Sequence, residues 1–153
     1  MVQAGRHLPA ARYRFDAIDV GDWLETGEMT VTAETIDAFA ELSGDRFVIH
    51  MDDAAARSYG FPRRVAHGLL VLSVVDGLKN AAPAQFDAIA SLGWDWRFER
   101  PVLAGDTVRA TITIAGKRRT KKLDRGILEL TVSVENQTGE TVQTGTNRLM
   151  VRR

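Results

Sequence analysis

Asp45 and His50 are the residues of this sequence whose types and spacing best suit acid–base chemistry. They lie five positions apart, directly after Gly44. A carboxylate and an imidazole that reach one water molecule can take a proton from it and return a proton, because the ordinary pKa of histidine, about 6.5, lies close to neutral pH. The apolar neighbours Ile49 and Met51 should hold His50 against a core rather than in open solvent.

A second histidine precedes the most apolar segment of the chain. His67 and Gly68 stand immediately before the run 69–75, which is interrupted only by Ser73. If this segment is a helix, the backbone N–H groups at its start have no partner within the helix and can bind an anion or a developing oxyanion. Periodicity alone does not decide between a buried helix and a buried strand over residues 67–78.

Each of these residues also has a purely structural interpretation. Asp45 could be a polar residue in the turn after a helix, and His50 a hydrogen-bonded histidine of the core. His67 could simply contact the loop before the apolar segment. The neighbours His50 and Asp52 could suggest a metal site, but neighbours on a loop point apart and a third ligand is not obvious. We therefore expect no metal.

The elements that must position these residues follow from hydrophobic periodicity and from capping residues. Residues 33–43 are predicted to form an amphipathic helix, with Thr32 as its N-cap and Gly44 as its C′ residue. A short helical turn is expected at 53–58. Short strands are expected at 13–18 and 28–31.

From residue 89 onward the pattern is typical of strands. Apolar residues alternate over 94–98, 108–115, 128–134 and 142–151, with loops expected at 101–106 and 117–126 and a hairpin turn at 136–139. Trp94, Trp96 and Phe98 share one strand face, which favours packing on the sheet or at a dimer contact. Helices in the first half and strands in the second predict the α+β class, with one antiparallel sheet and helices on one side.

Composition restricts the class of protein further. The 153 residues fit one domain, of which we expect residues 1–12 to be a poorly ordered terminus. The absence of cysteine excludes disulfides, thiolate metal sites and cysteine nucleophiles, and it fits a reducing compartment such as the cytoplasm. Because the net charge is zero and no apolar stretch approaches the ~20 residues of a membrane-spanning helix, we expect neither nucleic acid nor a membrane as a partner.

Four segments together resemble the MaoC-like, (R)-specific enoyl-CoA hydratase family of the hotdog fold. The family pattern is roughly Gly-Asp-x-Asn-Pro-hydrophobic-His-x-Asp, followed about a dozen residues later by Ala-His-Gly. Residues 44–52 correspond to the first motif and residues 66–68 to the second. Residues 98–108 look like the family's strand-to-strand segment, and residues 117–122, before Gly126, are a fourth match. The resemblance extends from about Thr26 to Val151.

This resemblance implies a single hotdog domain, with a long antiparallel sheet wrapped around a central apolar helix. It implies a hydro-lyase that adds water to a trans-2-enoyl-CoA, giving an (R)-3-hydroxyacyl-CoA, or removes it. Asp45 and His50 would activate one water, and the N–H of Gly68 would bind the thioester carbonyl. No cofactor is required beyond the coenzyme A of the substrate. A lone hotdog leaves a sheet edge exposed, so a homodimer or higher homo-oligomer is expected.

The sequence departs from the family pattern at Phe47 and Val48, which stand where Asn and Pro are usual. The replacement could reshape the acyl pocket, or it could mark a site that binds an acyl thioester without catalysis. His67 and Ser73 are further candidates for positions near the site. Asp76, an acid on the expected central helix, is similar to the carboxylate of hotdog thioesterases and keeps acyl-CoA hydrolysis as an alternative.

A basic run near the third strand of the second half is a candidate for the phosphates of coenzyme A or of an acyl carrier. Such a run more often forms a solvated hairpin tip. Cationic side chains also bind phosphates, either as point charges or as planar forks. The candidate residues are Lys117, Arg118, Lys121 and Lys122.

Overall fold

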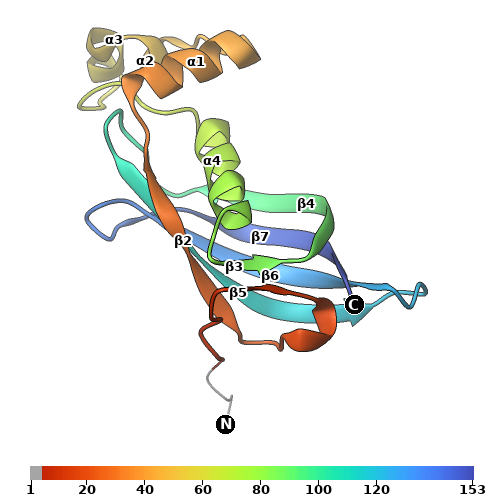
Figure 1. The fold of residues 1–153 in the computed structure, drawn as a ribbon. Helices are drawn as coiled ribbons and strands as arrows, with labels where there is room; N and C mark the ends of the chain where they lie inside the picture. The colour runs from red at the N-terminus through yellow and green to blue at the C-terminus, as the bar shows by residue number, and fades with distance from the viewer. Residues whose placement is uncertain (1–4) are drawn as a thin grey trace.

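The computed structural model of the protein describes residues 5–153 (Figure 1). Five strands form one antiparallel sheet in the order β2-β5-β6-β7-β4. Their bounds are Trp23–Thr30 for β2, Thr107–Arg119 for β5, Arg125–Glu135 for β6, Thr141–Arg152 for β7 and Ala88–Phe98 for β4. A separate parallel pair joins β1 (Ala11–Tyr13) to β3 (Ala84–Phe86). The predicted α+β class with one antiparallel sheet is confirmed.

The central apolar segment is a helix, α4 (Gly68–Asn80), and the curved sheet wraps around it (Figure 1). Its inner face packs Leu70, Val71 and Val75 into a core that includes Ile112 and Leu130 of the sheet. Apolar residues also lie outside this buried face, at the exposed Leu69 and the partly buried Leu72, Val74 and Leu78, which is why periodicity could not identify the helix. None of the helices formed by residues 5–153 is long and apolar enough to cross a bilayer.

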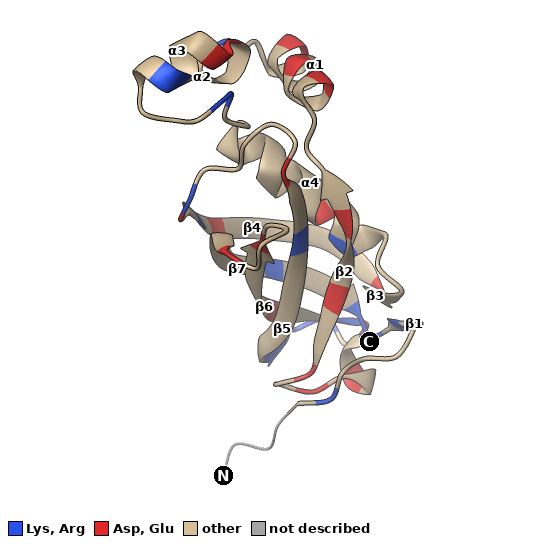
Figure 2. Cartoon of the chain, turned by 90° about the vertical axis from the view of Figure 1, so that its left-hand side faces the viewer, with Lys and Arg blue, Asp and Glu red and all other residues tan. Residues whose placement is uncertain are grey.

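Three short helices form a lobe beyond one end of the sheet, over the start of α4, as both views show (Figure 1, Figure 2). This helical lobe consists of α1 (Ala33–Ser43), α2 (Val48–Met51) and α3 (Asp53–Ser58). The bounds of α1 agree with the prediction: the Thr32 hydroxyl accepts a hydrogen bond from the Thr35 N–H at 3.1 Å, and Gly44 follows at φ 78°. The turn predicted at 53–58 is α3, whereas α2 was not predicted.

The structure corrects the strand predicted at 13–18. The strand β1 ends at Tyr13, and residues Phe15–Ala17 form a 3₁₀ turn. The chain turns there because Phe15 is buried against Gly126 of β6, and a straight strand could not bring its ring to that position. The strand predicted at 28–31 extends back to Trp23, with a register shift between Glu25 and Glu28.

Two further boundaries differ from the predictions. The loop expected over 117–126 is confined to residues 120–124, because β5 and β6 stay paired as far as Arg119 and Gly126. We expected a poorly ordered terminus over residues 1–12; residues 1–4 lie outside the described residues, but Leu8 is buried and Ala11 pairs with Ala84. The predicted hairpin turn at 136–139 is confirmed by a 3.0 Å hydrogen bond from the Gly139 N–H to the Asn136 carbonyl.

The strand β4 lies at one edge of the sheet and carries two of the three tryptophans. Trp94 and Trp96 pack against the core with their rings edge to face, at a centroid distance of 5.4 Å. Phe98 continues the alternation, but its ring is 57% exposed. Within the described part of the chain, β4 pairs with a long strand on one side only, so its other edge is free for a partner.

Candidate active site

Asp45 follows α1 in an exposed turn that orients its carboxylate. Its Oδ1 accepts a hydrogen bond from the Phe47 N–H at 3.2 Å, and its own N–H donates to the Ser43 hydroxyl at 3.1 Å. Such a turn, in which the side chain of an aspartate binds the backbone two residues on, fixes the χ1 angle of the aspartate. The second carboxylate oxygen accepts no hydrogen bond from residues 5–153 and can accept one from a ligand.

His50 lies on α2 and is 8% exposed. Its Nδ1 is 2.7 Å from the carbonyl oxygen of Val65. Since a carbonyl can only accept, Nδ1 must carry the hydrogen, and the neutral ring then has its lone pair on Nε2. The guanidinium of Arg64 donates to the His50 carbonyl at 2.6 Å and also pairs with Asp37 of α1, so α2 is held from both sides.

His67 is the residue before α4, and only 2% of its surface is exposed. Its Nε2 is 2.8 Å from the main-chain oxygen of Asp45, and its ring stacks on that of His50 at a centroid distance of 3.9 Å and an angle of 27°. Its Nδ1 is buried without a hydrogen-bond partner. The rings of the two histidines therefore lie face to face.

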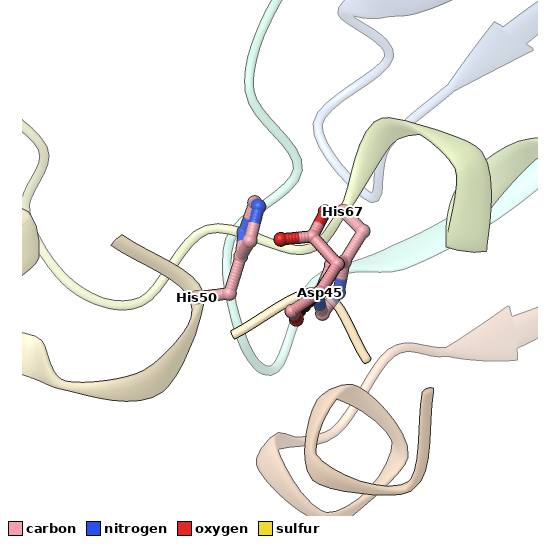
Figure 3. Close-up of side chains that lie close together, drawn as sticks. All are labelled: Asp45, His50 and His67. Atoms are coloured by element: carbon pink, nitrogen blue, oxygen red, sulfur yellow. Dashed lines mark hydrogen bonds between the residues drawn. The ribbon is translucent and has the colours of Figure 1, made fainter. Parts of the chain in front are cut away.

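The acid and the two histidines converge (Figure 3). One carboxylate oxygen of Asp45 and one ring nitrogen each of His50 and His67 all lie within 4.8 Å of one another. Donors and acceptors at such separations can share one water molecule, since a water hydrogen bond spans about 2.8 Å. The structure thus brings together the predicted pair, and His67, which was predicted to lie near the site, lies with them.

These residues line a mainly apolar cavity of about 460 Å³. The cavity lies between the helical lobe, the start of α4 and the ends of β4 and β7. Such a shape, with few polar groups in an apolar wall, is typical of a small-molecule site. The wall consists of Asp45, Ile49, His50, Phe61, Val65, Ala66, His67, Gly68, Leu69, Phe98, Glu99, Arg100, Pro101, Val102 and Gln143.

Gly68 begins α4 at the wall of this cavity, where the first N–H groups of a helix have no intrahelical partner. A Cβ atom at this position would lie 2.4 Å from Cζ of Phe98, so the aromatic ring rests directly on the glycine. Gln143 fixes the same turn: its Nε2 donates to the Gly68 carbonyl at 3.2 Å, while its Oε1 accepts from the Trp96 indole at 2.7 Å.

Burial lowers the pKa of His50 below its ordinary value of 6.5. The hydrogen bond to the Val65 carbonyl acts in the opposite direction, as does the negative charge of Asp45. The neighbouring His67 and Arg64 lower the pKa further. The net effect keeps the His50 imidazole neutral near pH 7, with Nε2 available as a base.

The three converging residues are those that could hold a metal ion, but the ring geometry opposes it. A histidine binds a metal along its ring plane at about 2.1 Å. Two ring planes that differ by 27° at a centroid distance of 3.9 Å do not meet at such a distance from both nitrogens. Both rings are also fixed by hydrogen bonds to carbonyl oxygens. The expectation of no metal stays a prediction that this geometry favours.

Three of the predicted site-adjacent residues do not line the cavity. The Phe47 ring is half exposed and meets the His50 ring edge-on at 6.0 Å. The Ser73 hydroxyl donates to the Leu69 carbonyl at 2.8 Å on an exposed face of α4. Asp76 forms an ion pair with the buried Lys79 at 2.8 Å. The structure thus gives the carboxylate proposed for thioester hydrolysis a structural partner.

The predicted phosphate contacts lie at the far end of β5. The Thr107 end of β5 follows the cavity residue Val102, whereas Lys117 and Arg118 are ten or more residues further along, roughly 35 Å for an extended strand. The Lys117 ammonium donates to the Ile18 carbonyl and lies 4.4 Å from the Phe15 ring centroid. Lys121 and Lys122 are exposed at the hairpin tip. We therefore propose no contact between this run and a ligand in the cavity of the same chain.

The sequence interpretation missed several residues that the cavity uses. Gln143, Phe98, Phe61 and Arg100 come from strands or loops far from Asp45 along the chain. The sequence did not single out Gln143, because β7 contains several other polar residues; the structure shows that its side chain is buried. Its hydrogen bonds to Trp96 and to Gly68 could not have been predicted without the tertiary structure.

Comparison with known proteins agrees with this arrangement. Residues 18–136 match the family described as the MaoC like domain. The chain is 40% identical over 125 residues to Protein MaoC of Klebsiella aerogenes, covering 81% of this chain but only 36% of that protein. It is 32% identical over 129 residues to the (R)-specific enoyl-CoA hydratase of Aeromonas caviae, covering 84% of this chain and 92% of that enzyme.

A Mycobacterium tuberculosis protein described as having a double hotdog fold matches with a TM-score of 0.81 and 22% identity, over 92% of this chain and 44% of that one. The chain therefore has the hotdog fold, with Asp45, His50 and His67 converging at its cavity. The chain belongs to the MaoC-like family of hydratases and dehydratases.

Proposed function

We propose that this protein catalyses the reversible addition of water to a trans-2-enoyl-CoA, to give an (R)-3-hydroxyacyl-CoA. The observation that carries the proposal is the convergence of the Asp45 carboxylate and the His50 imidazole within 4.8 Å in an apolar cavity. The name of the Aeromonas caviae relative supports coenzyme A as the acyl carrier and (R) as the configuration.

The bound water is held between the acid and the base. One water hydrogen points to the free oxygen of Asp45 and the other to Nε2 of His50, because both atoms can accept. As the water oxygen attacks C3, Nε2 takes one proton, and the imidazolium formed then gives a proton to C2. The hydroxyl and the hydrogen therefore add to the same face of the double bond. A positioned acid–base group contributes roughly 10²–10⁴-fold to such a step.

Negative charge develops on the thioester oxygen during the attack. Gly68 lines the cavity at the start of α4, which supports its N–H as the donor to this oxygen. The partial positive charge of a helix N-terminus favours the same charge development. Removal of one such donor typically costs about 10²–10³-fold in rate.

A spectroscopic assay with a short trans-2-enoyl-CoA tests the proposal. Loss of the enoyl absorbance without release of free thiol is expected. Asp45→Asn and His50→Ala should each lower the rate at least about a hundredfold. Matched controls are Asp95→Asn and His7→Gln, an exposed acid and an exposed histidine outside the cavity.

Other results of the same assay would indicate a different function. Release of thiol would indicate acyl-CoA hydrolysis, and Asp76→Asn would then show whether the acid on α4 takes part. If neither the enoyl absorbance nor free thiol changes at any acyl chain length, the protein would be an acyl-thioester-binding protein. Wild-type rates in both the Asp45 and His50 variants would show that the site is wrongly assigned.

We also propose that the chain forms a homodimer. The free edge of β4 and the exposed apolar residues Leu69, Leu92 and Phe98 beside it are surfaces that a second copy could cover. The double hotdog fold of the Mycobacterium tuberculosis protein supports the pairing of two such units. Sedimentation equilibrium should give twice the mass of 16.9 kDa; a monomer at micromolar concentration would contradict the proposal.

A further inference from the structure

The mechanism proposed above gives no role to His67, although this residue touches both members of the pair. It is only 2% exposed, its Nε2 contacts the Asp45 carbonyl at 2.8 Å, and its ring covers that of His50. We infer that His67 is a positioning residue. Its hydrogen bond holds the Asp45 turn at the start of α4, and its ring stacks on the His50 ring. The inference rests on the proposed function of the same site.

The turn that carries Asp45 has one hydrogen bond to a distant part of the described chain, the bond from His67. Among residues 5–153, the other hydrogen bonds of segment 44–47 go to partners no more than five positions away in the sequence. The bond from His67 is the one that spans 22 positions. Without it, the turn is held by its own local bonds, and the carboxylate has no fixed distance from the cavity wall.

The hydrogen-bond partners of each imidazole determine which ring nitrogen carries the hydrogen. The contact atom of His67 is a carbonyl oxygen, which can only accept, so Nε2 carries the hydrogen and Nδ1 is unprotonated in the neutral ring. Nδ1 is buried without a partner, so a proton there would have no acceptor among the described residues. In the neutral rings, His67 is therefore the Nε2–H tautomer and His50 is the Nδ1–H tautomer.

Neighbouring charged or titratable groups influence the protonation of His50. The charged or titratable groups that face it are Asp45 on the turn, His67 at the start of α4 and Arg64 on the preceding loop. Asp45 favours the imidazolium form, whereas His67 and Arg64 oppose it. Replacing His67 by an uncharged side chain therefore removes one of the two opposing groups and should move the acid limb of the pH–rate profile upward.

Three variants separate these effects. In His67→Gln the terminal amide can still donate to the Asp45 carbonyl, whereas in His67→Phe the ring stack remains but the donor is lost. We expect His67→Phe to lower kcat about 10- to 100-fold with little change in KM, as misplacement of a catalytic group does. His67→Gln should recover most of this loss. Both variants should show the upward shift of the acid limb, and His7→Gln should show neither effect.

Nitrogen-15 NMR of the histidine rings tests the placement without any assay of activity. The chain has three histidines, so His7→Gln leaves two ring systems to assign. We expect Nδ1–H for His50 and Nε2–H for His67 in the wild-type protein. The Nδ1–H tautomer of His67, or wild-type kcat with an unmoved acid limb in His67→Phe, would overturn the inference. If the wild-type protein does not hydrate enoyl thioesters, the proposed function fails while the tautomers still decide the placement of His67.

Discussion

Replacing Gly68 by alanine should drive the Phe98 ring away from the start of α4. The new Cβ would lie 2.4 to 2.7 Å from three ring atoms, whereas ordinary contact begins at 3.4 Å, so the ring must retreat by about 1 Å. The ring is the half-exposed end of a flexible side chain, which places the cost near the lower end of the ~1–3 kcal/mol typical of overpacking. The better helix propensity of alanine offsets up to ~1 kcal/mol.

The variant should therefore lose at most about 1 kcal/mol of unfolding free energy. Its kcat/KM should nevertheless fall tenfold or more, because the ring forms part of the cavity wall next to the N–H of residue 68. Urea unfolding and the enoyl-CoA assay measure the two effects separately. A loss of stability well above that of a single overpacked methyl group would show that the helix itself had moved.

Phe98→Ala supplies the matched background for this prediction. With the ring absent, Gly68→Ala meets no ring atom and should change the unfolding free energy by no more than ~0.5 kcal/mol, the usual error of additivity, apart from the gain in helix propensity. An equal penalty in the presence and in the absence of the ring would refute the steric argument, since the contact with Phe98 could not then be its cause.

Three further predictions concern stability. Burial lowers the pKa of His50 in the folded protein below its ordinary value of 6.5. At pH values between these two pKa values, the unfolded chain binds a proton more readily than the folded chain, so the free energy of unfolding should rise with pH. Urea titrations at several pH values should show this rise in the wild-type protein and its loss in His50→Gln. Asp87→Ala leaves three arginines without the buried carboxylate that they share. Since the arginine side chains are more than half exposed, solvent limits the loss of unfolding free energy to about 1–2 kcal/mol. An unchanged urea midpoint would contradict this prediction. Gly145→Ala places a Cβ 2.2 Å from the main-chain oxygen of Asp95, and because backbone cannot rotate away, the loss should be about 3 kcal/mol or more and exceed that of Gly68→Ala in the same measurement.

The sequence predicted those elements whose bonds are local. The bounds of α1 depend on Thr32 and Gly44, and each bonds a residue within four positions, so their signals stand in the sequence beside the helix. The 3₁₀ turn at Phe15 depends instead on a glycine in β6, more than a hundred positions away. The intrinsic strand propensity of residues 13–18 could not include that contact.

The site divides in the same way. Asp45 and His50 were found because they stand in one short motif, and the structure confirms that they converge. The stacking of His67 on His50 depends on how the chain returns to begin α4, and Gln143 reaches Gly68 across 75 positions. Such contacts are products of the complete fold, so no local pattern could have assigned these partners.

The acid and the base are carried by the helical lobe and its loops rather than by the sheet. Few of the lobe's side chains are buried, whereas the strands hold most of the core. Segments with few buried contacts open at a lower free energy than the whole molecule. Partial opening of the lobe would separate Asp45 from His50 while the sheet persists. Turnover should therefore be lost at denaturant concentrations that leave the circular dichroism of the sheet unchanged.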